Sequence, residues 1–181
     1  MTMIKGLSHF KIKEKNPEEA ISQFEIENEI VFPKLYRLFI KTYEERINLP
    51  LADDPNYGLR SLYDFKVNNY PDMVQLDFIE YKNAEEKFDT VFDGIDSIDT
   101  NEMFLIGTTP LKEGLFVGLI DEIYEKIILY NHTDEIQFKY LANDIFEFIS
   151  YFESRLHNRN NKFFRTESLY KNWGDEFWQV K

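Results

Sequence analysis

The stretch from Glu18 to Tyr43, EEAISQFEIENEIVFPKLYRLFIKTY, decides the fold of this chain. Asn16 and Pro17 stand directly before it, and a capping side chain followed by proline is a typical helix start. Pro33 disfavours helical geometry at the residue before it and can itself begin a helix, so we expect two helices separated by a short extended step. Each predicted helix has apolar residues at helical spacing, which are Ala20, Ile21 and Phe24 in the first and Leu35, Tyr36, Leu38, Phe39, Ile40 and Tyr43 in the second.

The composition indicates a folded protein with an aromatic core. The 181 residues suffice for one domain, which would bury roughly 70% of the surface of its unfolded chain. A hydrophobic share of 43% argues against a disordered chain, and the absence of cysteine excludes disulfides, thiolate metal sites and cysteine nucleophiles. The N-terminus has no apolar stretch of signal-peptide length, and no apolar run approaches the length of a bilayer span. We therefore expect a cytoplasmic protein.

The charge of the chain is strongly negative and unevenly distributed. The formal net charge is −12, so the summed field repels nucleic acid. Residues 154–181 contain six Lys or Arg and three Asp or Glu, a net charge of +3, and residues 1–153 therefore carry −15. A body this acidic either attracts a basic protein partner or simply keeps the chain soluble. We expect a protein partner and neither nucleic acid nor a membrane.

Beyond the opening stretch, the pattern predicts a set of strands. Asn48–Tyr57 is rich in Pro, Asn and Asp and is expected to be a loop, and Leu59–Val67 is ambiguous between strand and loop. Alternating apolar residues predict a strand at Val74–Tyr81. Three nearly continuous apolar runs predict central strands covered on at least one face, the last two joined by a hairpin loop at Asp121–Glu125: Met103–Ile106, Leu115–Ile120 and Lys126–Tyr130.

Further helices are predicted on either side of these strands. Residues 83–92 fit a short helix, and the apolar positions from Ala142 to Phe152 recur at helical spacing, with Asn143 and Asp144 near the start. Residues 163–180 contain many aromatic side chains, and we expect them to dock on the body as an extra C-terminal helical tail. These elements together predict the α+β class and one domain over residues 1–181, with a core at about 16–153 and an extension at 154–181.

The order of the predicted elements resembles the SUKH superfamily, the domain shared by fungal glucan-synthesis regulators (SMI/KNR-like proteins) and many bacterial immunity proteins. The similarity covers residues 18–153, and the chain departs from the usual pattern in three ways: Lys41–Ile47 lacks a glycine, residues 82–102 form a longer connection, and the basic aromatic tail after residue 154 falls outside the match. It rests on the strand pair at 114–130 and on Ile21, Phe24, Glu25, Asn28, the Phe32-Pro33 step, Tyr36, Phe39, Leu141, Ala142, Phe146, Phe148 and Ile149.

This resemblance implies both an architecture and a role. The implied architecture is a twisted antiparallel sheet packed by helices. The implied role is non-enzymatic, in which the chain binds a toxin domain, for example a nuclease with a basic active site, and neutralises it. Two alternatives stay open: a regulatory scaffold that recruits protein partners without blocking their chemistry, and a hydrolase that uses carboxylates.

Six acidic residues are the candidate partner-binding residues. Four recur at every third position and form a partner-facing row, a cation site, or a solvated loop whose Ile95 and Ile98 point inward. A calcium loop of the EF-hand type would need oxygen ligands at alternate positions and a glycine at the sixth, which this segment lacks. The other two precede Pro55 and either join the same surface or serve ordinary turn chemistry. The six residues are Asp53, Asp54, Asp93, Asp96, Asp99 and Glu102.

No catalytic motif is present in the sequence. The three histidines, His9, His132 and His157, form no metal-binding pair, although His132 stands close to Asp134 and Glu135, the minimum for acid–base chemistry. No serine has the Gly-x-Ser-x-Gly context of a hydrolase, and no glycine-rich phosphate loop occurs. We therefore expect neither a cofactor nor a metal, and no enzymatic activity.

Overall fold

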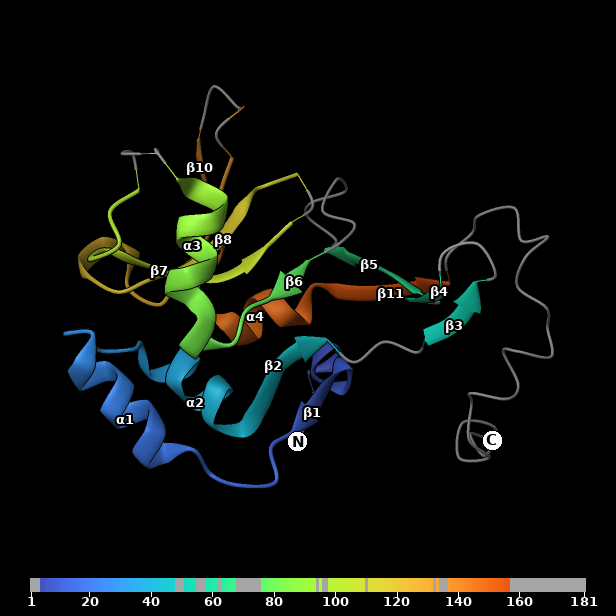
Figure 1. Ribbon diagram of the computed structural model, residues 1–181, viewed down its shortest axis with the longest axis horizontal. Helices are drawn as coiled ribbons and strands as arrows, with labels where there is room; N and C mark the ends of the chain where they lie inside the picture. The colour runs from blue at the N-terminus through green and yellow to red at the C-terminus, as the bar shows by residue number, and fades with distance from the viewer. Residues whose placement is uncertain are drawn as a thin grey trace.

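A five-stranded antiparallel sheet lies at the centre of the computed structural model (Figure 1). Its strand order is β10-β9-β8-β7-β6, and their bounds are β6 (Asp77–Phe78), β7 (Met103–Thr108), β8 (Gly114–Gly118), β9 (Ile127–Tyr130) and β10 (Phe138–Ala142). With its helices, the sheet confirms the predicted α+β class. The structure describes residues 4–47, 51–54, 58–61, 63–67, 76–93, 95, 98–109, 111–131, 133 and 137–156.

The two helices predicted from the opening stretch are present. They are α1 (Glu18–Glu27) and α2 (Lys34–Thr42), and the Asn16 side chain accepts a hydrogen bond of 3.1 Å from the Glu18 N–H, as expected for a helix start. The extended step ends at Pro33, as predicted. The predicted apolar faces are wrong in two positions, since Ala20 and Leu38 point to solvent.

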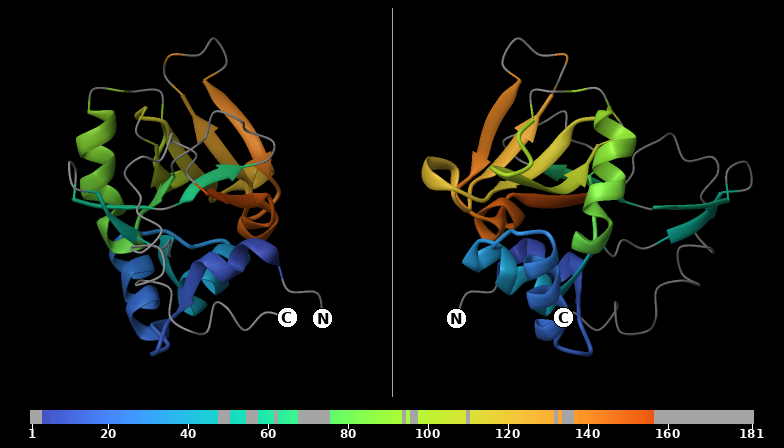
Figure 2. Two further views of the ribbon diagram at one scale, coloured as in Figure 1. Left: turned by 90° about the vertical axis from the view of Figure 1, so that its right-hand side faces the viewer. Right: turned by 60° about the vertical axis from the view of Figure 1, so that its left-hand side comes forward.

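Helices cover both faces of the sheet, which explains why its central strands are apolar at every position. Alternate residues such as Leu115 and Val117 pack against α1, α2 and α4 (Ile145–Ser150). The residue between them, Phe116, packs on the opposite face against α3 (Ala84–Phe92). Figure 2 shows α3 beside the sheet and α1, α2 and α4 gathered beneath it.

A short antiparallel pair, whose strands stand before α1 and after α2 in the chain, closes the lower side of the core. It consists of β1 (Phe10–Ile12), preceded by the 3-10 helix η1 (Lys5–His9), and β2 (Tyr43–Ile47), which continues directly from α2. Phe10 packs edge-on against Phe39 and Phe78, at ring distances of 5.2 and 5.3 Å. In this way the core residues of β1, α2 and β6 are joined.

Two segments differ from the loop and strand assignments predicted between residues 48 and 81. Within the predicted loop, β3 (Leu51–Asp54) pairs with β4 (Gly58–Ser61), so the loop prediction is wrong there. Of the strand predicted at Val74–Tyr81, the structure describes residues 76–81, and among these the strand β6 comprises only Asp77 and Phe78, which pair with β7 before the chain turns into the 3-10 helix η2 (Tyr81–Asn83).

The last predicted helix is shorter than its apolar spacing suggested. The Asp144 side chain accepts hydrogen bonds from the Phe146 and Glu147 N–H groups and so starts α4 at Ile145, while Ala142 belongs to β10. Phe152 begins β11 (Phe152–Leu156), which pairs with β5 (Tyr63–Val67) to the right of the sheet in Figure 1. The predicted C-terminal helical tail lies outside the described residues.

Candidate functional site

The connection between α3 and β7 runs along the sheet from one end to the other. At its start, Phe92 packs against Tyr130, which pairs with the first residue of β8. At its end, the Glu102 carbonyl accepts a hydrogen bond of 2.8 Å from the Leu119 N–H, just beyond the last residue of β8. The length of β7, roughly 17 Å, therefore separates Asp93 from Glu102. Of the acids in the row that the structure describes, Asp93 and Glu102 thus do not belong to one patch.

The apolar residues of this connection point inward, as the interpretation of a solvated loop predicted. Ile98 is buried and Ile95 is partly buried, and both pack with α3 and the sheet. The Asp99 side chain accepts hydrogen bonds from the backbone and side-chain N–H groups of Asn101, at 2.8 and 3.0 Å. The Asp99 carbonyl accepts from the N–H of Glu102, which closes the turn. Asp99 and Glu102 are exposed and come together at the start of β7.

A second acidic loop lies beside this turn. The 3-10 helix η3 (Asp121–Ile123) follows β8 and exposes Asp121 and Glu122. The Leu119–Glu102 hydrogen bond holds the two loops together. Gly118 permits the tight path, because a Cβ there would overlap the Ile123 carbonyl. We call the four exposed residues Asp99, Glu102, Asp121 and Glu122 the acidic end.

Two exposed apolar side chains accompany the acidic end. Ile120 precedes η3, and Tyr124, which is 45% exposed, follows it. Sequence reasoning missed Asp121 and Glu122 as site residues and placed them in an ordinary hairpin loop. Three consecutive antiparallel strands bring the start of the first and the turn between the second and third to the same end of a sheet. Applied to the three predicted strands that form β7, β8 and β9, this rule would have placed Asp121 and Glu122 beside Asp99 and Glu102.

The acidic end is also tied to helix α2. The Leu35 N–H, in the first turn of α2, donates a 2.9 Å hydrogen bond to the Glu125 carboxylate, which follows Tyr124. A carboxylate is favourable there because the N-terminus of a helix carries a partial positive charge. This contact fixes the η3 turn against the helical side of the molecule.

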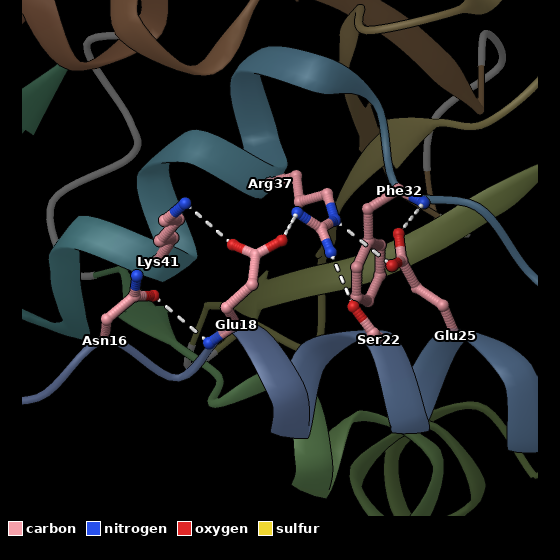
Figure 3. Close-up of polar contacts among 7 residues, drawn as sticks. All are labelled: Asn16, Glu18, Ser22, Glu25, Phe32, Arg37 and Lys41. Carbon is pink, nitrogen blue, oxygen red and sulfur yellow. Dashed lines mark hydrogen bonds and ion pairs between the residues drawn. The ribbon is translucent and has the colours of Figure 1, made fainter.

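A polar network in turn fixes α2 against α1 (Figure 3). The Arg37 guanidinium donates to the carboxylates of Glu18 and Glu25, at 2.6 and 3.1 Å, and to the Ser22 hydroxyl at 2.9 Å. Lys41 lies 2.7 Å from the second Glu18 oxygen. Hydrogen bonds from Lys41 and Arg37 lower the pKa of Glu18.

The same network holds the extended step between the helices. The second oxygen of Glu25 accepts a 2.8 Å hydrogen bond from the Phe32 N–H (Figure 3). The Glu25 carboxylate thus binds both the Arg37 guanidinium and the backbone of the extended step, and the network holds the step against α1.

The side chains of the remaining candidate residues are not among those that the structure describes. Asp53 and Asp54 are in β3, whose side chains are not described, and Asp96 and His132 lie outside the described residues. Among the residues that are placed, no three His, Cys, Asp or Glu side chains are grouped to hold a metal ion. No helix in that part of the chain is both long and apolar enough to cross a membrane.

Comparisons of the chain with family models, curated proteins and solved structures found no match.

Proposed function

We propose that this chain is a non-enzymatic, immunity-type protein that binds a toxin domain with a basic active site and neutralises it by covering that site. The observation that carries the proposal is the acidic end, where two neighbouring loops expose four carboxylates. A nuclease is one kind of toxin that fits, because its active site presents cations that bind phosphates. Carboxylates compete for the same cations and accelerate the encounter of the two proteins.

The apolar neighbours of the acidic end support a protein partner. Stable protein interfaces combine an apolar, aromatic centre with a polar rim, and tyrosine is frequent among the residues that dominate binding energy. Ile120 and Tyr124 supply such a centre beside the carboxylates of Asp121 and Glu122. We expect Tyr124 to be an anchor of the complex.

The rigidity of the two loops supports the same role. Asp99 closes one turn by hydrogen bonds, and Gly118 and Glu125 hold the other against β8 and α2. A preformed surface loses little conformational entropy on binding, so more of the contact energy appears as affinity. The SUKH resemblance of the sequence points to the same kind of function.

The test begins with capture of the partner by the full chain from its native host and identification by mass spectrometry. The purified partner is then assayed for enzymatic activity and for affinity at several salt concentrations. We expect the wild-type chain to block the activity. The variant Asp99→Asn, Glu102→Gln, Asp121→Asn, Glu122→Gln should bind about tenfold more slowly or worse, with a weaker salt dependence.

A matched control separates local from global charge. The variant Glu85→Gln, Glu86→Gln, Asp89→Asn, Asp93→Asn removes four exposed carboxylates from α3 and its end, so its net charge changes equally. It should bind nearly as the wild type does. Equal losses in both variants would show that the acidic end is not the contact surface. A partner that stays fully active when bound would contradict neutralisation and favour the scaffold alternative.

A further inference from the structure

A buried ion pair lies where β1, α2 and β2 meet. Lys13 Nζ is 2.8 Å from Glu45 Oε2 and donates a 2.6 Å hydrogen bond to the Ile40 carbonyl at the end of α2. The Glu45 side chain is only 3% exposed and that of Lys13 19%. Lys13 therefore satisfies one carboxylate oxygen of Glu45 and neutralises its charge inside the protein.

Three oxygen atoms beside this pair have no hydrogen-bond partner among the described residues. They are Glu45 Oε1 and the hydroxyls of Tyr36 and Tyr81, and all three side chains are buried. Buried polar groups are almost always hydrogen-bonded, to protein or to ordered water. Three such atoms near one ion pair therefore require an explanation.

The three side chains converge from different elements. Tyr36 comes from α2, Glu45 from β2 and Tyr81 from η2, and both tyrosine rings pack against Phe32, at 5.3 and 6.1 Å. The Tyr81 ring lies 5.9 Å from the Lys13 ammonium. Burial, and to a smaller extent the charge of Glu45, raises the pKa of both tyrosines, so their hydroxyls stay protonated and able to donate.

We infer that Glu45, Tyr36 and Tyr81 form an internal binding site for one small, uncharged hydrogen-bonding molecule, and that water occupies it. Water donates to Glu45 Oε1 and exchanges hydrogen bonds with the two hydroxyls, which satisfies all three atoms; buried waters typically make about three such bonds. A cation does not fit this chemistry, because Lys13 already balances the carboxylate. The bound molecule links the adjoining elements α2 and β2 to η2, which lies far from both in the sequence.

The test removes each hydroxyl and measures the thermal midpoint of the full chain. Tyr36→Phe and Tyr81→Phe each delete one hydrogen bond to the bound molecule and should lower the midpoint by about 2–4 °C. The double variant should depart from the sum of the two losses, because both hydroxyls hold the same molecule. Tyr140→Phe, an exposed tyrosine on β10, is the control and should leave the midpoint unchanged.

A crystal structure of the wild-type protein gives an independent readout. We expect density for one water within hydrogen-bond distance of Glu45 Oε1 and both hydroxyls. A midpoint that stays constant or rises in both single variants would overturn the inference. So would a crystal structure in which the tyrosines donate directly to Glu45 with no molecule between them.

Discussion

Two carboxylate–cation clusters flank helix α2, and they differ mainly in their access to water. In the outer cluster, Glu18 meets Lys41 and Arg37 at the surface between α1 and α2 (Figure 3). In the inner cluster, Glu45 meets Lys13 inside the protein. The contact distances are similar, at 2.6 and 2.7 Å outside and 2.8 Å inside. The pKa values nevertheless shift in opposite directions.

The opposite shifts follow from desolvation. For Glu18, hydrogen bonds from Lys41 and Arg37 outweigh a small effect of burial, and the pKa falls below 4.5. For Glu45, burial outweighs the hydrogen bond from Lys13, and the pKa rises above 4.5. The comparison shows that an ion pair seen in a structure does not by itself reveal whether its carboxylate favours or opposes folding.

The largest effect is expected when the inner cluster loses its cation. Lys13→Met leaves the Glu45 carboxylate buried without its counter-charge and should lower the free energy of unfolding by about 3 kcal/mol at neutral pH. Urea unfolding measures this loss. The loss should shrink as the pH falls, since protonation neutralises the unpaired Glu45.

The double variant Lys13→Met, Glu45→Leu is the decisive control. Replacing both partners by apolar residues removes the unpaired charge, so most of the lost stability should return. A double variant as unstable as Lys13→Met would mean that the packing of the Lys13 side chain, and not the stranded charge of Glu45, causes the loss.

The next effect concerns the outer cluster. Arg37→Ala removes donors to Glu18, Glu25 and Ser22 and should cost about 2 kcal/mol of unfolding free energy, because these charge-assisted hydrogen bonds are only partly exposed. Arg37→Lys keeps the charge but not the planar fork and should recover less than half of the loss.

Lys41→Ala provides the matched control for Arg37. It removes a single contact to Glu18, with both side chains more than a third exposed, and should cost less than about 1 kcal/mol. If Lys41→Ala were as damaging as Arg37→Ala, the network would act through overall charge and not through the several contacts that Arg37 makes.

The parts of this fold that the sequence predicts are those set by local signals. Asn16 and Pro33 fix where α1 and α2 begin, and continuous apolar runs mark the strands buried on both faces. The strand β11 could not be predicted in this way, because it pairs with β5, more than 80 residues earlier in the chain. Phe152 continues the helical spacing of α4, yet this distant pairing determines its conformation.

The sites were less predictable, for the same reason. The exposure of Asp99 and Glu102 follows from their polar surroundings, but their grouping with Asp121 depends on the register that places Met103 opposite Gly118. The sequence alone does not reveal that Glu45 is the buried glutamate, because Glu44, a residue of the same type, stands directly before it. Only the alternation of β2 turns the first of these two glutamates outward and the second inward.

The dependence of stability on pH sharpens the comparison of the two clusters. The lowered pKa of Glu18 contributes stability above pH 4.5 that is lost as the pH falls below it. The raised pKa of Glu45 acts with the opposite sign: between pH 4.5 and its folded pKa the native state binds more protons, so stability rises as the pH falls.

Two amide variants test these signs by urea unfolding between neutral pH and pH 4. Compared with the wild type, Glu18→Gln should lose less stability on acidification below pH 4.5, and Glu45→Gln should lose more, chiefly above pH 4.5. We expect both differences to be smaller than the losses in Lys13→Met and Arg37→Ala. Changes of the same sign in the two variants would refute the proposed contrast.

The smallest effect is expected from a third ion pair, which lies close to the inner cluster in the sequence. Lys11 and Glu44 lie 3.2 Å apart on β1 and β2 with side chains 56% and 42% exposed, so Lys11→Met should change the unfolding free energy by less than about 0.5 kcal/mol and less still at high salt. Because Lys11 precedes Lys13 by two residues, the substitution disturbs the same β1–β2 pairing without stranding a buried charge. A loss as large as that of Lys13→Met would assign both effects to strand pairing, and burial of Glu45 would no longer explain the difference between the clusters.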